Sequence, residues 1–407
     1  MPRRAPTVLP RPQKLKPEAS AGEMVETTLP TDPGELAGLL ESIPNGPAVF
    51  LLWPREGKPY LARTNVLRQR LNRLLEAKEG VSRFLNLRGT AERLEYHLAG
   101  SKLESRFLHL DLARAHSGPD YRREIRLRLP PYVKLLLSNE FPRTQIAARL
   151  GKTSRSQYVG PFRNRSTAAQ FESAFLDLFQ LRRCQEDLVP SPTHPGCIYG
   201  EMGRCLRPCQ QAVGVDEYRS EARRVAEFLR SGGRSLMASA SGERERLSAE
   251  MDFEGAARAH QRVQKIEEVL GWRDEMARDV EQLHAIAIVP SAKPESVELG
   301  WLRGGFWHGF RCLDFITADD GRAVSLDSRL REMAATIPAS GARPATTFAN
   351  LERTEHLAIL SRWFYSSWCD GELLVADDWE KIPWRKLVNA VSRVAATRRK
   401  PRPSKHS

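Results

Sequence analysis

The spacing of apolar residues changes from strand-like to helical within the first part of the chain. Apolar runs at 48–53 and 58–62 flank a turn at Arg55-Glu56-Gly57, and the apolar positions that follow recur at helical spacing as far as Leu75. We therefore predict two strands and a helix here. Similar patterns predict further helices at 101–116, 167–181, 216–230 and 234–271, a strand at 132–137 and a turn at 158–161.

Beyond residue 280 the pattern becomes that of strands. The segments 285–289, 297–303 and 306–316 are alternating or continuously apolar, and Gly304-Gly305 separates the last two as a hairpin turn. Helices are expected at 351–368 and 384–395. Within 234–271, Asp252 is the expected N-cap of an apolar stripe formed by Phe253, Ala256, His260, Val263, Ile266 and Leu270.

These segments together predict an α+β protein of several domains. The first 35 to 40 residues are basic and proline-rich without an apolar core, which is typical of a flexible leader. We expect a flexible basic leader (1–40), a small α/β domain (41–150), a linker helix with a cysteine-rich loop (151–212), a helical region (213–275), a mixed α/β domain (276–396) and a basic tail (397–407).

The charge balance favours a phosphate-rich partner. The chain has 63 Lys and Arg against 50 Asp and Glu, a formal net charge of +13. An arginine-rich solvated surface would give the same surplus, so charge alone leaves nucleic-acid binding open. The sequence contains no run of 18 apolar residues, so we expect no membrane span and a cytoplasmic protein.

Four of the six cysteines lie close together in the sequence. Cys184, Cys197, Cys205 and Cys209 have the spacing C-x12-C-x7-C-x3-C. Thiolates gathered in this way usually hold a metal ion or an iron–sulfur cluster. Zinc sites usually contain two closely spaced cysteine pairs, and only one pair is close here. The spacing therefore leaves zinc and iron–sulfur both open.

With its flanks, the cysteine loop resembles UvrC, the nuclease subunit of bacterial nucleotide excision repair. The resemblance rests on 158–209, YVGPF…LFQLRRC…GRCLRPC, which is similar to the family's linker and four-cysteine loop. Residues 47–75 resemble the GIY-YIG nuclease motif, 236–270 the UVR helical hairpin, and 297–315 the hairpin that follows. The resemblance implies a GIY-YIG-like domain at 41–150, DNA as a partner and contact with UvrB through 236–270.

The same resemblance implies that Cys184, Cys197, Cys205 and Cys209 hold a [4Fe–4S] cluster, with zinc as the alternative. It also places remnants of the nuclease site at Tyr60, Arg63 and Arg70. The family's tyrosine helps to activate water, its basic residues contact the phosphate, and a glutamate holds one divalent cation. Here Phe50 replaces the first tyrosine of the motif, and His109 stands at the position of the glutamate.

The histidine is a poor substitute for the glutamate, because Mg²⁺ prefers carboxylate oxygen as a ligand. Glu104 lies five residues earlier, and Asp111 lies about 200° around the helix from His109. We therefore expect the nuclease site to be weak or inactive, with Mg²⁺ or Mn²⁺ bound only if it is active. Phosphate contacts are expected from Arg63, Arg68, Arg70 and Arg73.

The sequence thus predicts a UvrC-like DNA-binding protein of nucleotide excision repair with a degenerate GIY-YIG site. One alternative is an active single-incision endonuclease with a rearranged metal site. The other is a nucleic-acid-binding protein outside repair that uses the same fold. A complete UvrC also carries an RNase H-like domain and helix-hairpin-helix motifs, and we do not expect both within 407 residues.

Overall fold

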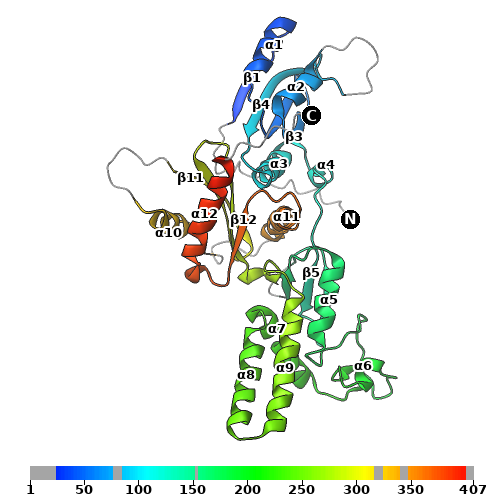
Figure 1. Cartoon of the computed structure of the whole chain (residues 1–407). Helices are drawn as coiled ribbons and strands as arrows, with labels where there is room; N and C mark the ends of the chain where they lie inside the picture. The colour runs from blue at the N-terminus through cyan, green and yellow to red at the C-terminus, as the bar shows by residue number, and fades with distance from the viewer. Residues whose placement is uncertain (1–23, 77–84, 152–154, 316–323, 340–346, 400–407) are drawn as a thin grey trace, which may run out of the picture.

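The computed structural model describes residues 24–76, 85–151, 155–315, 324–339 and 347–399. These residues form three four-stranded antiparallel sheets that are covered by helices (Figure 1). The predicted α+β class is therefore confirmed. None of the helices in these ranges is long and apolar enough to span a membrane.

The first sheet has the strand order β1-β4-β2-β3. Its strands are β1 (Val25–Thr28), β2 (Ala48–Pro54), β3 (Tyr60–Thr64) and β4 (Ala91–Leu98). The helices α1 (Pro33–Ser42) and α2 (Leu67–Leu75) share one apolar core with Phe50 and Leu52 of β2. Val49 and Leu51 are buried as well. Because β2 is covered on both faces, its sequence is a continuous apolar run rather than an alternating one.

Part of the segment predicted as a flexible leader (1–40) forms regular structure. Strand β1 pairs with β4, and α1 begins after Asp32, whose carboxylate accepts hydrogen bonds from the backbone N–H groups of Gly34 and Glu35, both at 2.9 Å. The polar segment VETT hid a short edge strand, because three of its four residues are exposed and give no apolar alternation. The rest of this segment, 1–23, lies outside the described residues.

The third sheet lies in the carboxyl-terminal half and has the order β11-β10-β9-β12. It contains β9 (His284–Pro290), β10 (Ser296–Arg303), β11 (Phe306–Asp314) and β12 (Glu372–Ala376). The helices α10 (Leu326–Ala335) and α12 (Trp384–Arg399) pack on one face. The other face is covered by α11 (Thr347–Phe364) and, unexpectedly, by α3 (Lys102–His116).

Helix α3 joins the first sheet to the third. It begins after Ser101, whose hydroxyl accepts a hydrogen bond from the N–H of Glu104 at 3.0 Å. Phe107 of α3 stacks on Trp307 of β11, with ring centroids 4.3 Å apart and planes 6° from parallel. The apolar face that was predicted to belong to 41–150 is therefore shared with the carboxyl-terminal sheet.

The second sheet crosses two of the predicted domain boundaries. Its order is β6-β5-β7-β8, with β5 (Tyr132–Leu136), β6 (Arg143–Ala147), β7 (Ser156–Gly160) and β8 (Arg278–Asp279). The predicted boundary at 150 falls inside this sheet, and the boundary at 275 precedes its last strand. The turn predicted at 158–161 is also wrong, since Tyr158 to Gly160 belong to β7.

A long helical hairpin extends from the second sheet, at the bottom of Figure 1. The helices α5 (Arg165–Leu176), α7 (Val215–Ser231) and α9 (Phe253–Gly271) pack on that sheet, and α8 (Arg234–Ala249) pairs with α9. The break between α7 and α8 lies at Gly232 and Gly233, which have φ values of 65° and 84° that favour glycine. The predicted N-cap Asp252 is confirmed, accepting from the N–H of Gly255 at 2.9 Å.

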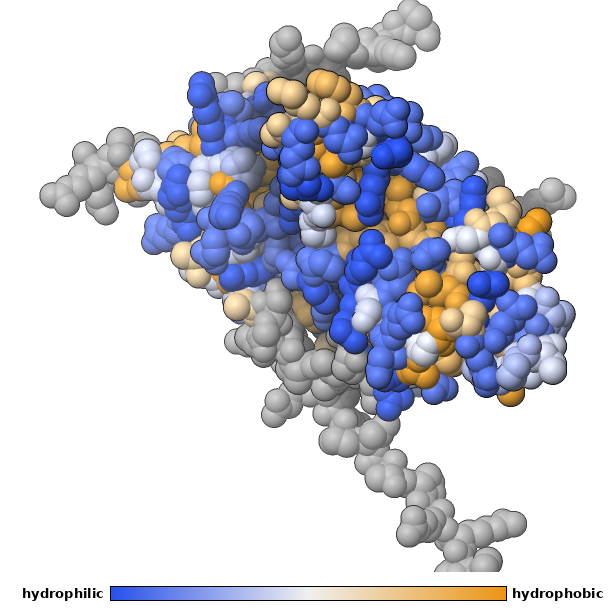
Figure 2. Space-filling view, turned by 90° about the horizontal axis from the view of Figure 1, so that it is seen from below, coloured by the Kyte–Doolittle hydropathy of each residue, from blue (hydrophilic) through white to orange (hydrophobic). Residues whose placement is uncertain are grey.

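The buried stripe of α9 differs from the prediction. It contains Ala259, Val263, Ile266 and Val269, whereas Phe253 is 72% exposed and His260 is exposed. Phe253 begins α9 at the free turn of the hairpin, where few neighbours cover it. Figure 2 views the molecule from this end and shows a mostly hydrophilic surface with apolar areas between the charged side chains.

Candidate nucleic-acid interface and cysteine loop

The structure brings two of the predicted nuclease residues together. Tyr60 begins β3, and Arg70 lies on α2. The Nη2 group of Arg70 donates a hydrogen bond to the Tyr60 hydroxyl at 3.0 Å. The Phe50 ring, at the position of the first motif tyrosine, lies 6.2 Å from the Tyr60 ring. Tyr60 and Arg70 therefore lie side by side. The hydroxyl that the first motif tyrosine would add is missing, because Phe50 stands in its place.

The other two residues, Arg63 and His109, lie on the opposite face of the first sheet. Side chains alternate along a strand, so Tyr60 and Ala62 of β3 pack towards α2, while Arg63 points towards α3. Arg63 is close enough to His109 for its charge to lower the pKa of the imidazole. The four residues therefore form two pairs rather than one site, and Arg63 does not share a face with Arg70 and Arg73.

His109 is a neutral side chain in a cationic environment. Burial is the main cause that lowers its pKa to about 4, and the charges of Arg63 and Arg106 contribute to this shift. Burial also lowers the pKa of Arg106 to about 10, together with the charges of Arg63 and Arg362. Positive charge thus surrounds the position where the family has a metal-binding carboxylate.

The nearby carboxylates do not restore a cation site. Glu104 is fully buried, and its Oε2 accepts a hydrogen bond from the N–H of Gly100 at 2.7 Å. Asp111 lies on another side of α3, where it faces Arg114 at 3.7 Å. In the ranges that the structure describes, no three His, Cys, Asp or Glu side chains are arranged to hold a metal ion. A divalent cation beside His109 would meet guanidinium groups instead of oxygen ligands.

Two residues beside His109 were missed by the sequence analysis. Arg106 precedes His109 by three positions on α3, so helical spacing could have identified it. Arg362 lies on α11, and its charge lowers the pKa of Arg63 and of Arg106. No local pattern could have indicated Arg362, because it comes from a helix more distant in the sequence than any motif extends.

The four clustered cysteines share one neighbourhood in the structure. Cys197 precedes α6 (Ile198–Glu201), and Cys209 lies in a single 3-10 turn, Pro208–Gln210. Cys205 and Cys209 are buried, whereas Cys197 is exposed. Burial raises the pKa of Cys205 to about 11, and the other three cysteines of the group add to this shift. Such thiols stay protonated unless a positive centre stabilises their thiolates.

Arg182 anchors the cysteine loop to the second sheet and to the helices that pack on it. Its side chain is only 1% exposed, and its Nε donates to the Phe141 carbonyl at 3.0 Å. Its Nη1 donates to the Glu186 carbonyl at 3.0 Å and to the Cys184 sulfur at 3.4 Å. A second N–H donor, from the backbone of Arg207, reaches the Cys205 sulfur at 3.4 Å. Donors of this kind stabilise thiolate ligands.

The donor set of the loop fits a thiolate-ligated cluster in its chemistry. It offers four thiols that influence one another's charge, with N–H donors directed at two of the sulfurs. As they stand, the described thiols are not arranged in a group that could hold a metal ion. The choice between an iron–sulfur cluster and zinc stays a prediction.

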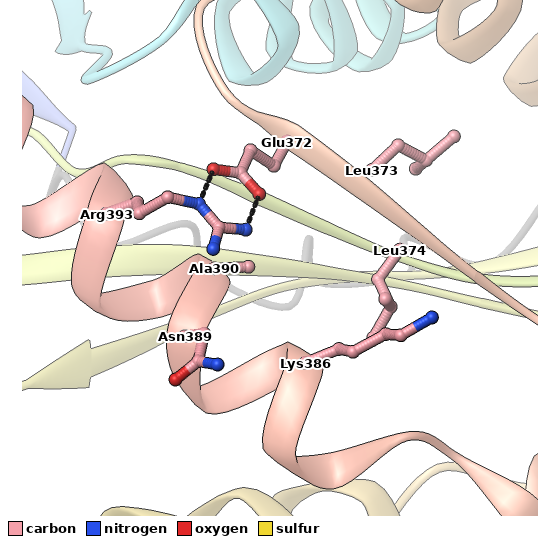
Figure 3. Close-up of a pocket in the computed structure, with 7 residues that line it drawn as sticks. All are labelled: Glu372, Leu373, Leu374, Lys386, Asn389, Ala390 and Arg393. Atoms are coloured by element: carbon pink, nitrogen blue, oxygen red, sulfur yellow. Dashed lines mark hydrogen bonds and ion pairs between the residues drawn. The ribbon is translucent and has the colours of Figure 1, made fainter.

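A pocket of about 180 Å³ lies between β12 and α12, away from both groups of residues. Figure 3 shows that Glu372 and Arg393 are directed at one another, whereas Lys386 points away from them. The Glu372 carboxylate accepts two hydrogen bonds from Arg393, at 2.7 Å from Nε and 2.5 Å from Nη2. This pair closes one end of a hollow whose remaining lining includes Leu374 and Ala390. We regard it as a feature of packing rather than as a reactive site.

Comparison with known proteins places these features in context. Residues 131–228 match the family model of the UvrC/Cho excinuclease middle domain. The UvrABC system protein C of Lachnospira eligens is 23% identical over 273 residues, which cover 65% of this chain and 44% of that protein. The corresponding protein of Moorella thermoacetica is 25% identical over 289 residues, which cover 70% of this chain and 46% of that protein. No solved structure matches.

The match to the middle domain agrees with the structure. It begins at the start of β5 and includes α5, the cysteine loop and most of α7, which share one core with the second sheet. The chain spans less than half the length of the curated relatives named above. Residues 131–228 are thus similar to the UvrC/Cho middle domain, and the chain is similar to part of UvrABC system protein C over about two thirds of its own length.

Proposed function

We propose that this chain is a DNA-binding protein of nucleotide excision repair whose GIY-YIG-like domain contacts phosphate without cutting it. One observation supports this most directly: a neutral histidine beside arginines occupies the position of the metal-binding glutamate. GIY-YIG chemistry uses a cation that stabilises charge on the attacked phosphate. Tyr60 and Arg70 remain paired, but they lie on the other face of the sheet from His109.

The basic surface supports DNA as the ligand. The chain has a net charge of +13, and exposed arginines such as Arg63 and Arg73 can contact phosphate. Arg68 is less suited to this role than the sequence suggested, because its Nε donates to the Ile43 carbonyl at 2.8 Å. We expect binding that weakens steeply with salt, since each phosphate contact releases counterions.

The cysteine loop is proposed to hold a [4Fe–4S] cluster through Cys184, Cys197, Cys205 and Cys209. When bound, the cluster would fix the loop between α5 and α7 by joining four points of its chain. Arg182 and the backbone of Arg207 would then donate hydrogen bonds to two of the ligand sulfurs. Their role is to hold the loop and to stabilise thiolate charge, which is a structural role.

The α8–α9 hairpin is the proposed contact with UvrB, within residues 236–270. At its free turn, Met251 is 76% exposed and Phe253 is 72% exposed. Two large apolar side chains in this position gain little from the fold itself, because the hairpin core lies farther along α9. A partner that covers them would remove apolar surface from water.

The test is a reconstituted repair reaction with damaged duplex DNA, UvrA, UvrB and Mg²⁺ or Mn²⁺. We expect salt-dependent DNA binding and UvrB binding, without incision above background. Phe253→Ala should weaken UvrB binding about tenfold or more, the cost of losing a buried aromatic anchor, and should leave DNA binding unchanged. Incision that Tyr60→Phe abolishes would instead support an active endonuclease. DNA binding without any UvrB binding would favour a role outside repair.

A further inference from the structure

We propose that Arg63, Arg106 and Arg362 together form a binding site for one phosphate group of the DNA backbone. The site is completed by α11 of the carboxyl-terminal unit, so it is not a property of the GIY-YIG-like domain alone. This inference rests on the proposed DNA binding and specifies where one of its phosphate contacts lies. Arg106 and Arg362 are not among the residues that the family resemblance identified.

Three neighbouring elements contribute the arginines of this site, and the charges of the three arginines act on one another. Arg63 comes from β3, and Arg362 comes from α11, which packs along α3. Lys102 and Arg106 are one helical turn apart, so they lie on the same face of α3 as His109. Arg63 and Arg362 are exposed, so the site opens to solvent and can accept a group that belongs to a long polymer.

An aromatic side chain holds Arg106 in position. The centre of its guanidinium lies 4.4 Å from the centroid of the Trp368 ring, and the Lys102 ammonium lies 5.6 Å from the same ring. Stacking on an aromatic face fixes the plane of a guanidinium and leaves its N–H edge available for hydrogen bonds. The Nε of Arg106 is buried and has no hydrogen-bond partner among the described residues.

The positive charge at this site is not balanced by the fold. No ion pair joins Arg63, Arg106 or Arg362 to a carboxylate in the described parts of the chain; the nearest acidic influence on Arg106 is Asp370. Both oxygens of Asp370 are engaged already, by the backbone N–H of Lys102 at 2.6 Å and by Trp363 Nε1 at 2.9 Å. Packing like charges together costs free energy, which an anion between them would recover.

A phosphodiester suits this arrangement in charge and in hydrogen bonding. Its two non-bridging oxygens can accept from several guanidinium N–H groups at once, which is the preferred geometry of arginine with phosphate. The arginines would neutralise phosphate charge, as a metal ion does, but they cannot lower the pKa of a bound water in the way that a metal can. The site would therefore bind a phosphate and leave its ester bonds intact.

The first experiment measures binding of a short fluorescent DNA duplex over a range of salt concentrations. We compare the wild-type chain with Arg106→Gln, Arg362→Gln and the control Arg219→Gln, which removes the same charge from the exposed surface of α7. Each of the first two variants should bind roughly five- to tenfold more weakly and reduce the salt slope by about 0.9. Arg219→Gln should match the wild type within about twofold.

A second measurement separates the DNA backbone from free phosphate and shows that the variants fold. Inorganic phosphate should raise the Tm of the wild type above that in chloride of equal ionic strength, and this increase should disappear in Arg106→Gln and Arg362→Gln. If the variants lose the phosphate effect but keep the wild-type salt slope, the occupant is free phosphate and the DNA assignment is wrong. If they keep both, the site is wrong, while DNA binding stands. If the wild type shows no salt-dependent DNA binding, the proposed function fails, and the phosphate measurement still decides the site.

Discussion

His109 shows how one side chain changes what the first sheet can do chemically. A glutamate in its place would be charged and could hold a cation between the sheet and α3. The imidazole instead stays neutral, because burial, Arg63 and Arg106 all lower its pKa, to about 4. A neutral base among guanidinium groups can exchange a hydrogen bond, but it offers no charge to a metal.

The lowered pKa of His109 predicts a pH dependence of stability. Between pH 6.5 and 4 the unfolded chain binds a proton at this residue and the folded chain does not, so the folded state loses stability as pH falls. His109→Gln removes that contribution. Between pH 7 and pH 4.5, the wild type should therefore lose more unfolding free energy than His109→Gln, as measured by urea denaturation. His260→Gln, on the exposed side of α9, is the control and should follow the wild type; a profile for His109→Gln that also follows it would contradict the argument.

At this scale, the sequence identified the candidates but not their grouping. The pairing of Tyr60 with Arg70 follows from a strand and the helix directly after it, which are local in the chain. The separation of Arg63 from that pair follows from strand alternation, which the motif comparison did not consider. Arg362 was beyond prediction, because a side chain becomes a neighbour of Arg63 only after two distant units pack together.

At the scale of elements, α11 is joined to α3 and to the short helix α4 (Tyr121–Glu124) through one buried carboxylate. Glu355 of α11 is 1% exposed, and its carboxylate accepts hydrogen bonds from Arg114 of α3, Arg122 and the Tyr121 hydroxyl, the last at 2.6 Å. Arg122 and Tyr121 belong to α4. One buried carboxylate thus binds groups from two other helices and holds α3 against α11.

Removing the charge of Glu355 should destabilise the fold far more than removing the charge of an exposed glutamate. Glu355→Gln leaves two arginines without their partner, and we expect a loss of about 3 kcal/mol. Glu372→Gln breaks the surface pair with Arg393 seen in Figure 3, for which we expect less than about 1 kcal/mol. Urea denaturation of both variants gives the comparison, and equal losses would show that Glu355 is not a tie between the helices.

Elements whose apolar residues follow one clear spacing were predictable from the sequence. Elements in which charged residues interrupt that spacing were not. The hairpin of β10 and β11 and the capped start of α9 follow from spacing, glycine and an acidic N-cap. Strand β4 was missed because charged residues interrupt its apolar pattern; two of them, Arg93 and Glu95, pair with each other at 3.0 Å. The burial of Phe253 was predicted wrongly. Helical spacing identifies the apolar face of a helix but not how far along the helix other elements cover that face.

At the scale of the whole molecule, the sheets combine segments from different predicted domains. Changes of pattern along the chain predicted boundaries at 150 and 275, but the second sheet takes strands from both sides of each. The first and third sheets share α3 in the same way. Strand pairing between distant segments depends on register and packing, and neither is visible in a local pattern.

If the cysteine loop holds the proposed cluster, the second sheet and its helices should be less stable without iron. Anaerobically purified protein should contain about four iron atoms per chain. Cys205→Ser should lose the iron and speed amide hydrogen exchange in α7 and in the connection between β5 and β6, because the loop is anchored there through Arg182. Cys369→Ser, an exposed thiol outside the loop, should keep both iron content and exchange rates. One zinc and no iron in the wild type would overturn the proposal.

The pairing of β7 with β8 has a consequence for how the chain is made. Val159 and Gly160 of β7 pair with Asp279 and Arg278 of β8. The two β8 residues are synthesised about 120 residues later, which takes on the order of 10 s at bacterial rates of synthesis. All four loop cysteines and the whole α8–α9 hairpin emerge during that interval, before the sheet can close. We therefore expect nascent chains halted before residue 278 to be the species most prone to aggregation, and the proposed cluster to be inserted while the edge of β7 is still open.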